Sequence, residues 1–169
     1  GGFHSPGELT VEGDWSNAAF FLAAKALGSS VTVQNLNPDS PQGDRACARL
    51  LPALAADNLT ICAADIPDLV PILAVTAAAN HGAVFTDMRE ALGGKASATE
   101  DTLTVCGTGL KGGTVDSRDD HRIAMAAAIA ATVCQKGVTI LGAQCVEKSY
   151  PGFFEEFRKL GGSYEQHLR

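Results

Sequence analysis

The sequence predicts a mixed α/β fold in which one small unit, two helices packed on a short sheet, occurs three times. Alanine-rich apolar stretches begin at Ser16, Asp68 and Asp120, and these three starts are 52 residues apart. Each stretch ends at a break containing glycine or asparagine, and a short run with β-branched or aromatic residues follows. Fixed spacing of this kind is typical of repeated supersecondary units. We therefore expect approximate threefold symmetry, with helices inside and sheets outside.

The first unit shows the pattern most completely. Ser16 is a good N-cap residue, because its hydroxyl accepts a hydrogen bond from an unpaired helical N–H group. Gly28 follows the apolar stretch and is typical of a helix end. Pro52 lies inside the second expected helix, where we expect it to cause a kink. The expected elements are helix 17–27, strand 31–33, helix 43–56 and strand 59–62.

The second unit is incomplete. It has the helix 69–79 after Asp68 and the strand 83–85, but few residues then precede 89–94, which resemble the last turn of a helix and its glycine cap. By comparison with the other units, the second lacks a loop and most of a helix. We infer that a segment of very roughly 20 residues is missing between about 86 and 89.

The third unit repeats the order of the first. Asp120 precedes its long helix, and Pro151 stands where a helix tolerates proline in its first turn. The runs between units two and three alternate apolar and polar residues around turns, which favours strands. The expected helices are 123–133 and 151–160, and the expected strands are 95–99, 102–106, 113–115 and 138–141.

Composition limits the classes of function. The 169-residue chain is 46% hydrophobic, which is enough to bury a core within a single domain of residues 1–169. A net charge of −6 argues against a nucleic-acid partner, so an anionic ligand needs a local cluster of cations. No apolar stretch approaches the roughly 20 residues that cross a bilayer, and the sequence starts without a signal-peptide pattern. We expect a cytoplasmic protein with no membrane partner.

The cysteines and histidines do not indicate a metal centre. Five cysteines, an odd number, are spread mostly through apolar runs, and the four histidines are scattered. We expect buried thiols in a reducing compartment, and no metal.

The segment 116–125 carries charge of an unusual sign for its position. His121 and Arg122 fall in the first turn of an expected helix, where an exposed positive charge is unfavourable by about 0.3–1 kcal/mol. A bound anion would reverse that effect, since backbone N–H groups and a guanidinium together bind carboxylates and phosphates well. Alternatively, Asp119 and Asp120 cap the helix and neutralise Arg122 in a surface cluster. The sequence leaves both interpretations open.

Asp68 and Lys148 are the other candidates. Asp68 begins the equivalent helix of the second unit, so it is either an N-cap or a partly desolvated carboxylate suited to accept a proton. Lys148 precedes the last helix, where most lysines are simply solvated. In a threefold-symmetric domain the loops that enter helices gather at one end. Asp68, Arg122 and Lys148 could therefore face a common space.

These residues carry a resemblance to a known family. The runs 5–7, 11–16, 37–44 and 67–68 occur in the family's order, followed by Asp120-His121-Arg122 and Lys148-Ser149-Tyr150-Pro151. Together they resemble the C-terminal domain of the 5-enolpyruvylshikimate-3-phosphate (EPSP) synthases, also called 3-phosphoshikimate 1-carboxyvinyltransferases, over nearly the whole chain.

The resemblance implies a fold and an activity. The fold is an inside-out α/β barrel of three βαβαββ-type units, in an enzyme of two similar domains. The reaction transfers the enolpyruvyl group of phosphoenolpyruvate to the 5-hydroxyl of 3-phosphoshikimate without metal or organic cofactor. By position, Asp68 matches a proton acceptor at the 5-hydroxyl and Arg122 a ligand of the phosphoenolpyruvate carboxylate. His121 matches a neighbour at the site, and Lys148 matches a lysine that reaches the phosphate.

The departures from the family are equally informative. The resemblance implies a family stretch with a lysine, a glutamate and a second arginine in the inferred gap after Phe85, and we expect the family's N-terminal domain to lie outside these 169 residues. We therefore expect this chain alone to be inactive, and its exposed interdomain face to favour self-association. The alternative is a non-catalytic module that binds small anions weakly. The transferase acting on UDP-N-acetylglucosamine is disfavoured by the Asp-His-Arg run, and RNA 3′-phosphate cyclase by the acidic composition.

Overall fold

The computed structural model describes residues 4, 7–8, 10–86, 96–98 and 102–167. In the N-terminal half, the elements are α1 (Trp15–Ala26), η1 (Gly43–Ala46), α2 (Cys47–Ala56), β1 (Leu59–Cys62), η2 (Pro67–Leu69), α3 (Val70–Ala79) and β2 (Gly82–Thr86), where η denotes a 3₁₀ helix. The C-terminal half has β3 (Ala96–Ala98), β4 (Thr102–Cys106), β5 (Gly113–Asp116), α4 (His121–Ala131), β6 (Val138–Leu141), η3 (Ala143–Lys148) and α5 (Phe153–Lys159).

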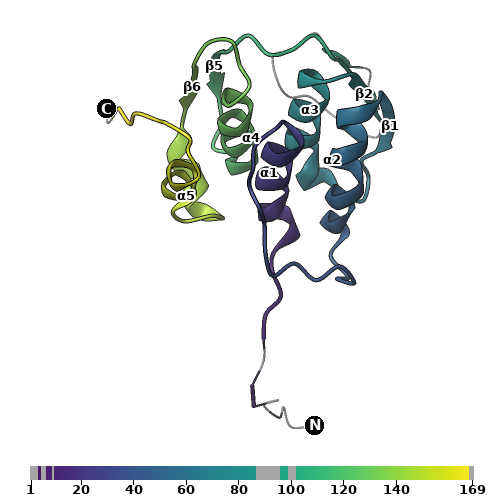
Figure 1. Cartoon of the computed structure of the whole chain (residues 1–169), viewed down its shortest axis with the longest axis vertical. Helices are drawn as coiled ribbons and strands as arrows, with labels where there is room; N and C mark the ends of the chain where they lie inside the picture. The colour runs from purple at the N-terminus through teal and green to yellow at the C-terminus, as the bar shows by residue number, and fades with distance from the viewer. Residues whose placement is uncertain (1–3, 5–6, 9, 87–95, 99–101, 168–169) are drawn as a thin grey trace.

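Helices α1 to α4 pack against one another between two groups of strands (Figure 1). Strands β5 and β6 lie on one side of them, and β1 and β2 lie on the other. The alanine-rich sequences explain this position, because short side chains let helices approach closely and leave no wide polar face. In α3, every residue except Pro71 and Ala79 is buried, and in α4 the run from Ala124 to Ala130 is buried. The expectation of buried helices is confirmed.

The strands form two separate sheets. One has the order β1-β2-β4-β3, in which β1 and β2 are parallel and β4 is antiparallel to both of its neighbours. The other is the parallel pair β5-β6. Parallel strands need a crossover connection, and here α3 connects β1 to β2 while α4 connects β5 to β6. Both helices therefore begin where a strand ends, which places their N-termini at comparable positions.

The mixed α/β class is confirmed, but one predicted strand is wrong. Residues 31–33 form no strand in the structure. Their β-branched side chains favour an extended backbone, yet a strand also needs a neighbour's N–H and C=O groups. The described residues supply no such neighbour at this place. Consequently only two of the three expected units show a parallel strand pair, and the threefold repetition of sheets is not seen in the described part of the chain.

The long helices agree with the sequence to within a few residues, but their caps differ. Asp14, not Ser16, caps α1, since its side chain accepts a hydrogen bond from the Ser16 backbone N–H at 2.9 Å. Asp120 caps α4 as one interpretation predicted, accepting from the backbone N–H of Arg122. Asp68 is no cap, because neither η2 nor α3 has a side-chain cap. Pro151 lies in a turn before α5 and not in its first turn.

Two further expectations concern cysteines and the inferred gap. Cys47 and Cys145 are buried as expected, whereas Cys62 and Cys106 are exposed at the ends of β1 and β4, so the expectation of buried thiols is wrong for these two. Residues 87–95, where the segment inferred to be missing would join, lie outside the described residues. Within the described part of the chain, no helix has the length and apolar character needed to span a membrane.

Candidate anion-binding site

Three segments that are distant in sequence meet at the N-terminus of α4. The Nη1 group of Arg122 in α4 donates a hydrogen bond to the Asp68 carboxylate of η2, 54 residues away. The Nζ atom of Lys148, the last residue of η3, lies 3.5 Å from the backbone carbonyl oxygen of Asp119. The topology explains the meeting, because α3 and α4 each follow a strand end and pack against each other. The structure therefore brings Asp68, Arg122 and Lys148 to one end of the helix layer.

Asp120 holds the Arg122 guanidinium from the side. Its Oδ1 accepts from Nε at 2.9 Å, and its Oδ2 accepts from Nη2 at 2.6 Å. The same Oδ1 accepts from the Arg122 backbone N–H at 2.9 Å. A planar guanidinium matches a carboxylate in this two-pronged way, so the side chain is oriented as well as charged. Hydrogen bonding to Arg122 lowers the pKa of Asp120, and Asp120 in turn raises the pKa of Arg122.

The site is open to solvent. The side chains of Arg122, Asp68 and Asp120 are 34%, 51% and 28% exposed. Lys148 is exposed, and His121, the first residue of α4, is partly buried. Because these groups remain accessible, a small anion can reach the guanidinium without local unfolding.

The structure contains features of both interpretations that the sequence left open. Asp120 caps α4 and pairs with Arg122, as the surface-cluster interpretation requires. Asp119 does not cap α4, because the N-cap position is occupied by Asp120. The backbone carbonyl of Asp119 contacts Lys148. Sequence reasoning did not anticipate the direct pair between Asp68 and Arg122. The equal spacing of the two helix starts was the available signal, since equivalent positions in packed repeats come close together.

Sequence reasoning also missed Ser117, which links the loop before α4 to the start of η3. Ser117 is fully buried, and its hydroxyl donates to the Gly142 carbonyl at 3.1 Å and accepts from the Cys145 thiol at 3.7 Å. The two residues after it, Arg118 and Asp119, have positive φ angles of 52° and 59°. This fixed turn presents the Asp119 carbonyl to Lys148. A serine between charged residues gives no sequence signal of such burial.

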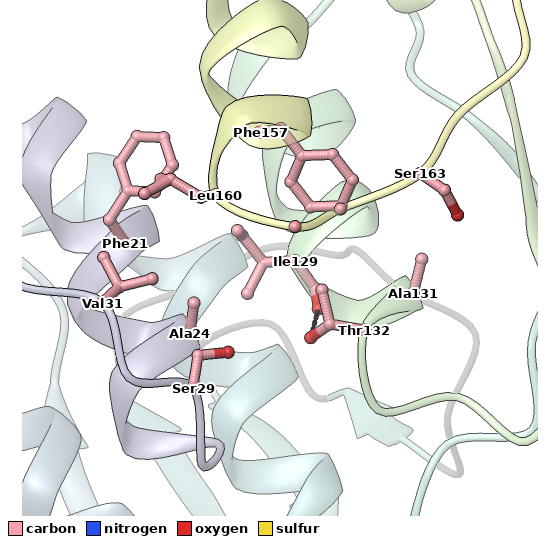
Figure 2. A pocket seen from close by; sticks show the side chains of 12 residues that line it. Phe21, Ala24, Ser29, Val31, Ile129, Ala131, Thr132, Phe157, Leu160 and Ser163 are labelled. Carbon is pink, nitrogen blue, oxygen red and sulfur yellow. Dashed lines mark hydrogen bonds between the residues drawn. The ribbon is translucent and has the colours of Figure 1, made fainter.

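A cavity lies at a different place in the molecule, away from Arg122. A cavity of about 300 Å³ is lined by Phe21 of α1, Ile129 and Thr132 at the far end of α4, and Phe157 and Leu160 near α5 (Figure 2). Its side chains are mainly apolar, and the hydroxyl of Thr132 is already bonded to the carbonyl of Ile129. None of its lining residues is charged. The cavity therefore lacks the chemistry of an anion site. No cluster of potential metal ligands occurs among the residues described by the structure.

The ion pair between Asp120 and Arg122 predicts a contribution to stability that is lost in acid. The native pKa of Asp120 lies below its ordinary value of 3.8, so the ionised carboxylate stabilises the fold above that value and the contribution disappears as pH falls through the native pKa. Asp120→Asn keeps a good N-cap but removes the charge. We expect this variant to lose about 0.5–1 kcal/mol of unfolding free energy at pH 7 and clearly less at pH about 2. Urea denaturation at both pH values tests this, and an equal loss at both would contradict it.

The fold and site define a mixed α/β domain with an arginine and a lysine at the start of a buried helix, an arrangement suited to bind a small anion. The family model for EPSP synthase (3-phosphoshikimate 1-carboxyvinyltransferase) matches residues 1–57 and 79–157. The chain belongs to the EPSP synthase family. The matched residues include His121, Arg122 and Lys148, whereas Asp68 lies between the two matched parts.

Individual relatives agree with the family match. The chain is 35% identical to a 3-phosphoshikimate 1-carboxyvinyltransferase from Clostridium kluyveri, over 94% of this chain and 46% of the relative. It is 38% identical to one from Clostridium novyi, over 94% of this chain and 45% of the relative. An EPSP synthase structure from Acinetobacter baumannii has a TM-score of 0.78 at 23% identity, over 94% of this chain and 48% of that one, and so supports the fold. The chain spans about half the length of the curated relatives it matches.

Proposed function

We propose that this chain is the C-terminal domain of an enzyme that transfers the enolpyruvyl group of phosphoenolpyruvate to the 5-hydroxyl of 3-phosphoshikimate. The observation that carries the proposal is the contact of Asp68 with Arg122 at the start of α4, with Lys148 beside the same turn. This arrangement offers a guanidinium for a carboxylate, an ammonium for a phosphate and a carboxylate for a proton. Membership of the EPSP synthase family supports the same assignment.

Each residue has a role in the proposed reaction. Arg122 binds the carboxylate of phosphoenolpyruvate, Lys148 reaches its phosphate, and His121 contributes to the same site. Asp68 accepts the proton of the 5-hydroxyl as that oxygen bonds to C2 of phosphoenolpyruvate and C3 takes up a proton. The resulting adduct then loses phosphate from C2 and a proton from C3, which restores the double bond. Proton transfer and positive charge at the leaving phosphate are the contributions expected of protein groups here.

The domain organisation is also part of the proposal. We infer that the complete domain is the inside-out barrel of three units, and that a second, N-terminal domain covers the site. The sheet β5-β6 has two strands among the described residues, and residues 31–33 belong to no strand there, which fits a sheet that needs further strands. The Clostridium kluyveri alignment is 194 residues long, more than the whole 169-residue chain, which supports a segment missing from this sequence.

A second candidate function follows from the same contacts. Arg122 is already paired with two carboxylates, so the chain could be a module that binds small anions only weakly and catalyses nothing. In that case Asp68 would serve only as a surface partner of Arg122. The two candidate functions predict different activities for a protein in which this chain is joined to the missing parts of an EPSP synthase. The first predicts catalysis and the second predicts none.

A chimaera tests the proposed function. Residues 1–169 are joined to the N-terminal half of the Clostridium kluyveri relative, and the relative's own residues are inserted between 86 and 89. We expect phosphate release from phosphoenolpyruvate that depends on 3-phosphoshikimate, and a loss of roughly a hundredfold or more in kcat/KM for Arg122→Gln. Arg49→Gln, an exposed arginine on α2, is the matched control and should retain activity. A chimaera that folds but whose activity is indifferent to Arg122→Gln would refute the assignment.

A further inference from the structure

Asp68 and Asp120 hold Arg122 very differently. Asp120 makes three hydrogen bonds to Arg122 at 2.6–2.9 Å, and its own side chain is only 28% exposed. Asp68 reaches Arg122 through one oxygen to Nη1, and its side chain is 51% exposed. Among the described residues, Arg122 is the partner of the Asp68 carboxylate. Asp120 therefore fixes the guanidinium, whereas Asp68 is held at its surface by a single contact.

The geometry of the guanidinium makes this difference important. Arg122 has five N–H donors in one plane, and Asp120 occupies the edge formed by Nε and Nη2. The remaining edge, formed by Nη1 and the second hydrogen of Nη2, can hold another carboxylate or a phosphate in a two-pronged way. Asp68 occupies Nη1 on that edge. An incoming anion and Asp68 therefore need the same donor.

Charge also opposes simultaneous binding. With both aspartates in place, two negative charges surround one positive guanidinium, so a third negative group would meet net repulsion. Breaking the ion pair between Asp68 and Arg122 costs little free energy, because an exposed ion pair contributes little to stability. Lys148 adds to the attraction for an anion, since its contact among the described residues is with the neutral carbonyl of Asp119.

We propose that Asp68 is an internal competitor for the free edge of Arg122, and that a carboxylate or phosphate ligand binds by displacing it while Asp120 keeps its bonds. The inference rests on the proposed function, because it treats Arg122 as the anion-binding residue. Its consequence is a coupling between two steps. Filling the Arg122 edge with phosphoenolpyruvate releases an ionised carboxylate beside the bound ligand, where the hydroxyl that must lose a proton would lie.

Titration of the full chain tests the competition. Inorganic phosphate and phosphoenolpyruvate are added separately, and the apparent Kd is measured from the NMR shifts of the Arg122 and Ile123 amides. Asp68→Asn preserves the size of the side chain but removes its charge. We expect this variant to bind both anions roughly two- to fivefold more tightly than the wild type, since the competing pair is exposed. Loss of a proposed substrate-contacting group would thus improve binding.

Two controls separate competition from general charge effects. Asp65→Asn removes the same charge from an exposed residue close to Asp68 in sequence, and its affinity should stay near that of the wild type. In the wild type, saturation with either anion should change the NMR chemical shift of the side-chain carboxylate carbon of Asp68 but not that of Asp120. Arg122→Gln should weaken binding both alone and combined with Asp68→Asn.

The outcomes distinguish the two proposals. If Asp68→Asn binds no better than the wild type while Arg122→Gln binds worse, the competition is wrong and the role of Arg122 stands. An equal gain in Asp65→Asn, or no anion binding by Asp68→Asn, also overturns the competition. If Arg122→Gln leaves binding unchanged, the proposed function fails at this residue and the competition fails with it.

Discussion

The isolated 169-residue chain is expected to release no phosphate above background when it is supplied with phosphoenolpyruvate and 3-phosphoshikimate. Its candidate groups lie on an open surface, where Arg122 is 34% exposed and Asp68 is 51% exposed. Efficient group transfer requires reactants held in a fixed geometry in a site from which water is excluded. An open cluster on one domain can attract an anion, but it cannot orient two substrates against each other.

The sequence gives a second reason to expect inactivity. The family resemblance implies a lysine, a glutamate and another arginine in the segment that we infer to be missing after Phe85, and the chain spans about half the length of its curated relatives. The proposed reaction needs a proton donor for C3 of phosphoenolpyruvate, and the residues assigned here include only a proton acceptor, Asp68. We therefore expect a chain with these gaps to lack transition-state interactions that the proposed reaction needs.

A phosphate-release assay on the purified polypeptide measures the expected inactivity. Mass spectrometry of the same sample should give 17.5 kDa, which verifies that the assayed polypeptide is the 169-residue chain. The Clostridium kluyveri relative, assayed in parallel, shows that the conditions support turnover. Turnover by the isolated chain that disappears in Arg122→Gln would show that this half contains the complete chemistry.

The parts of the fold that depend on local pattern could be predicted from sequence. Helices α3 and α4 follow from their apolar stretches and flanking polar residues, and both lie within about three residues of the ranges expected. Strands β1 and β6 match their predicted ranges, because their short β-branched runs are bounded by turn residues. In these segments local preference and tertiary packing favour the same structure.

The features that depend on partners in space could not be predicted. Residues 31–33 have strand-like side chains but no neighbouring strand among the described residues. Asp68 has the residue type of a helix cap, yet it lies inside η2 and not at its N-cap position, and its carboxylate pairs with Arg122. Equal spacing indicated that these two helix starts are equivalent. It did not indicate that their side chains would neutralise each other.

The segment that carries Lys148 is fixed by aromatic packing around Phe153. The Phe153 ring is fully buried, with the centroids of Phe21, Tyr150, Phe154 and Phe157 between 5.3 and 6.3 Å away. Backbone hydrogen bonds connect this cluster to η3, since the N–H of Phe153 donates to the carbonyl of Tyr150 and the N–H of Tyr150 donates to the carbonyl of Val146. The cluster therefore holds both α5 and the end of η3 on the helix layer.

Phe153→Ala is accordingly expected to destabilise the protein by about 3–5 kcal/mol, through lost burial and the cavity left behind. Urea denaturation measures this loss, which is a large part of the 5–15 kcal/mol typical of a folded domain. Leu160→Ala, which truncates a nearby side chain that is 50% exposed, is the control and should cost less than about 0.5 kcal/mol. A cost for Phe153→Ala below about 1 kcal/mol would mean that neighbouring rings refill the space, and would contradict the role assigned to this cluster.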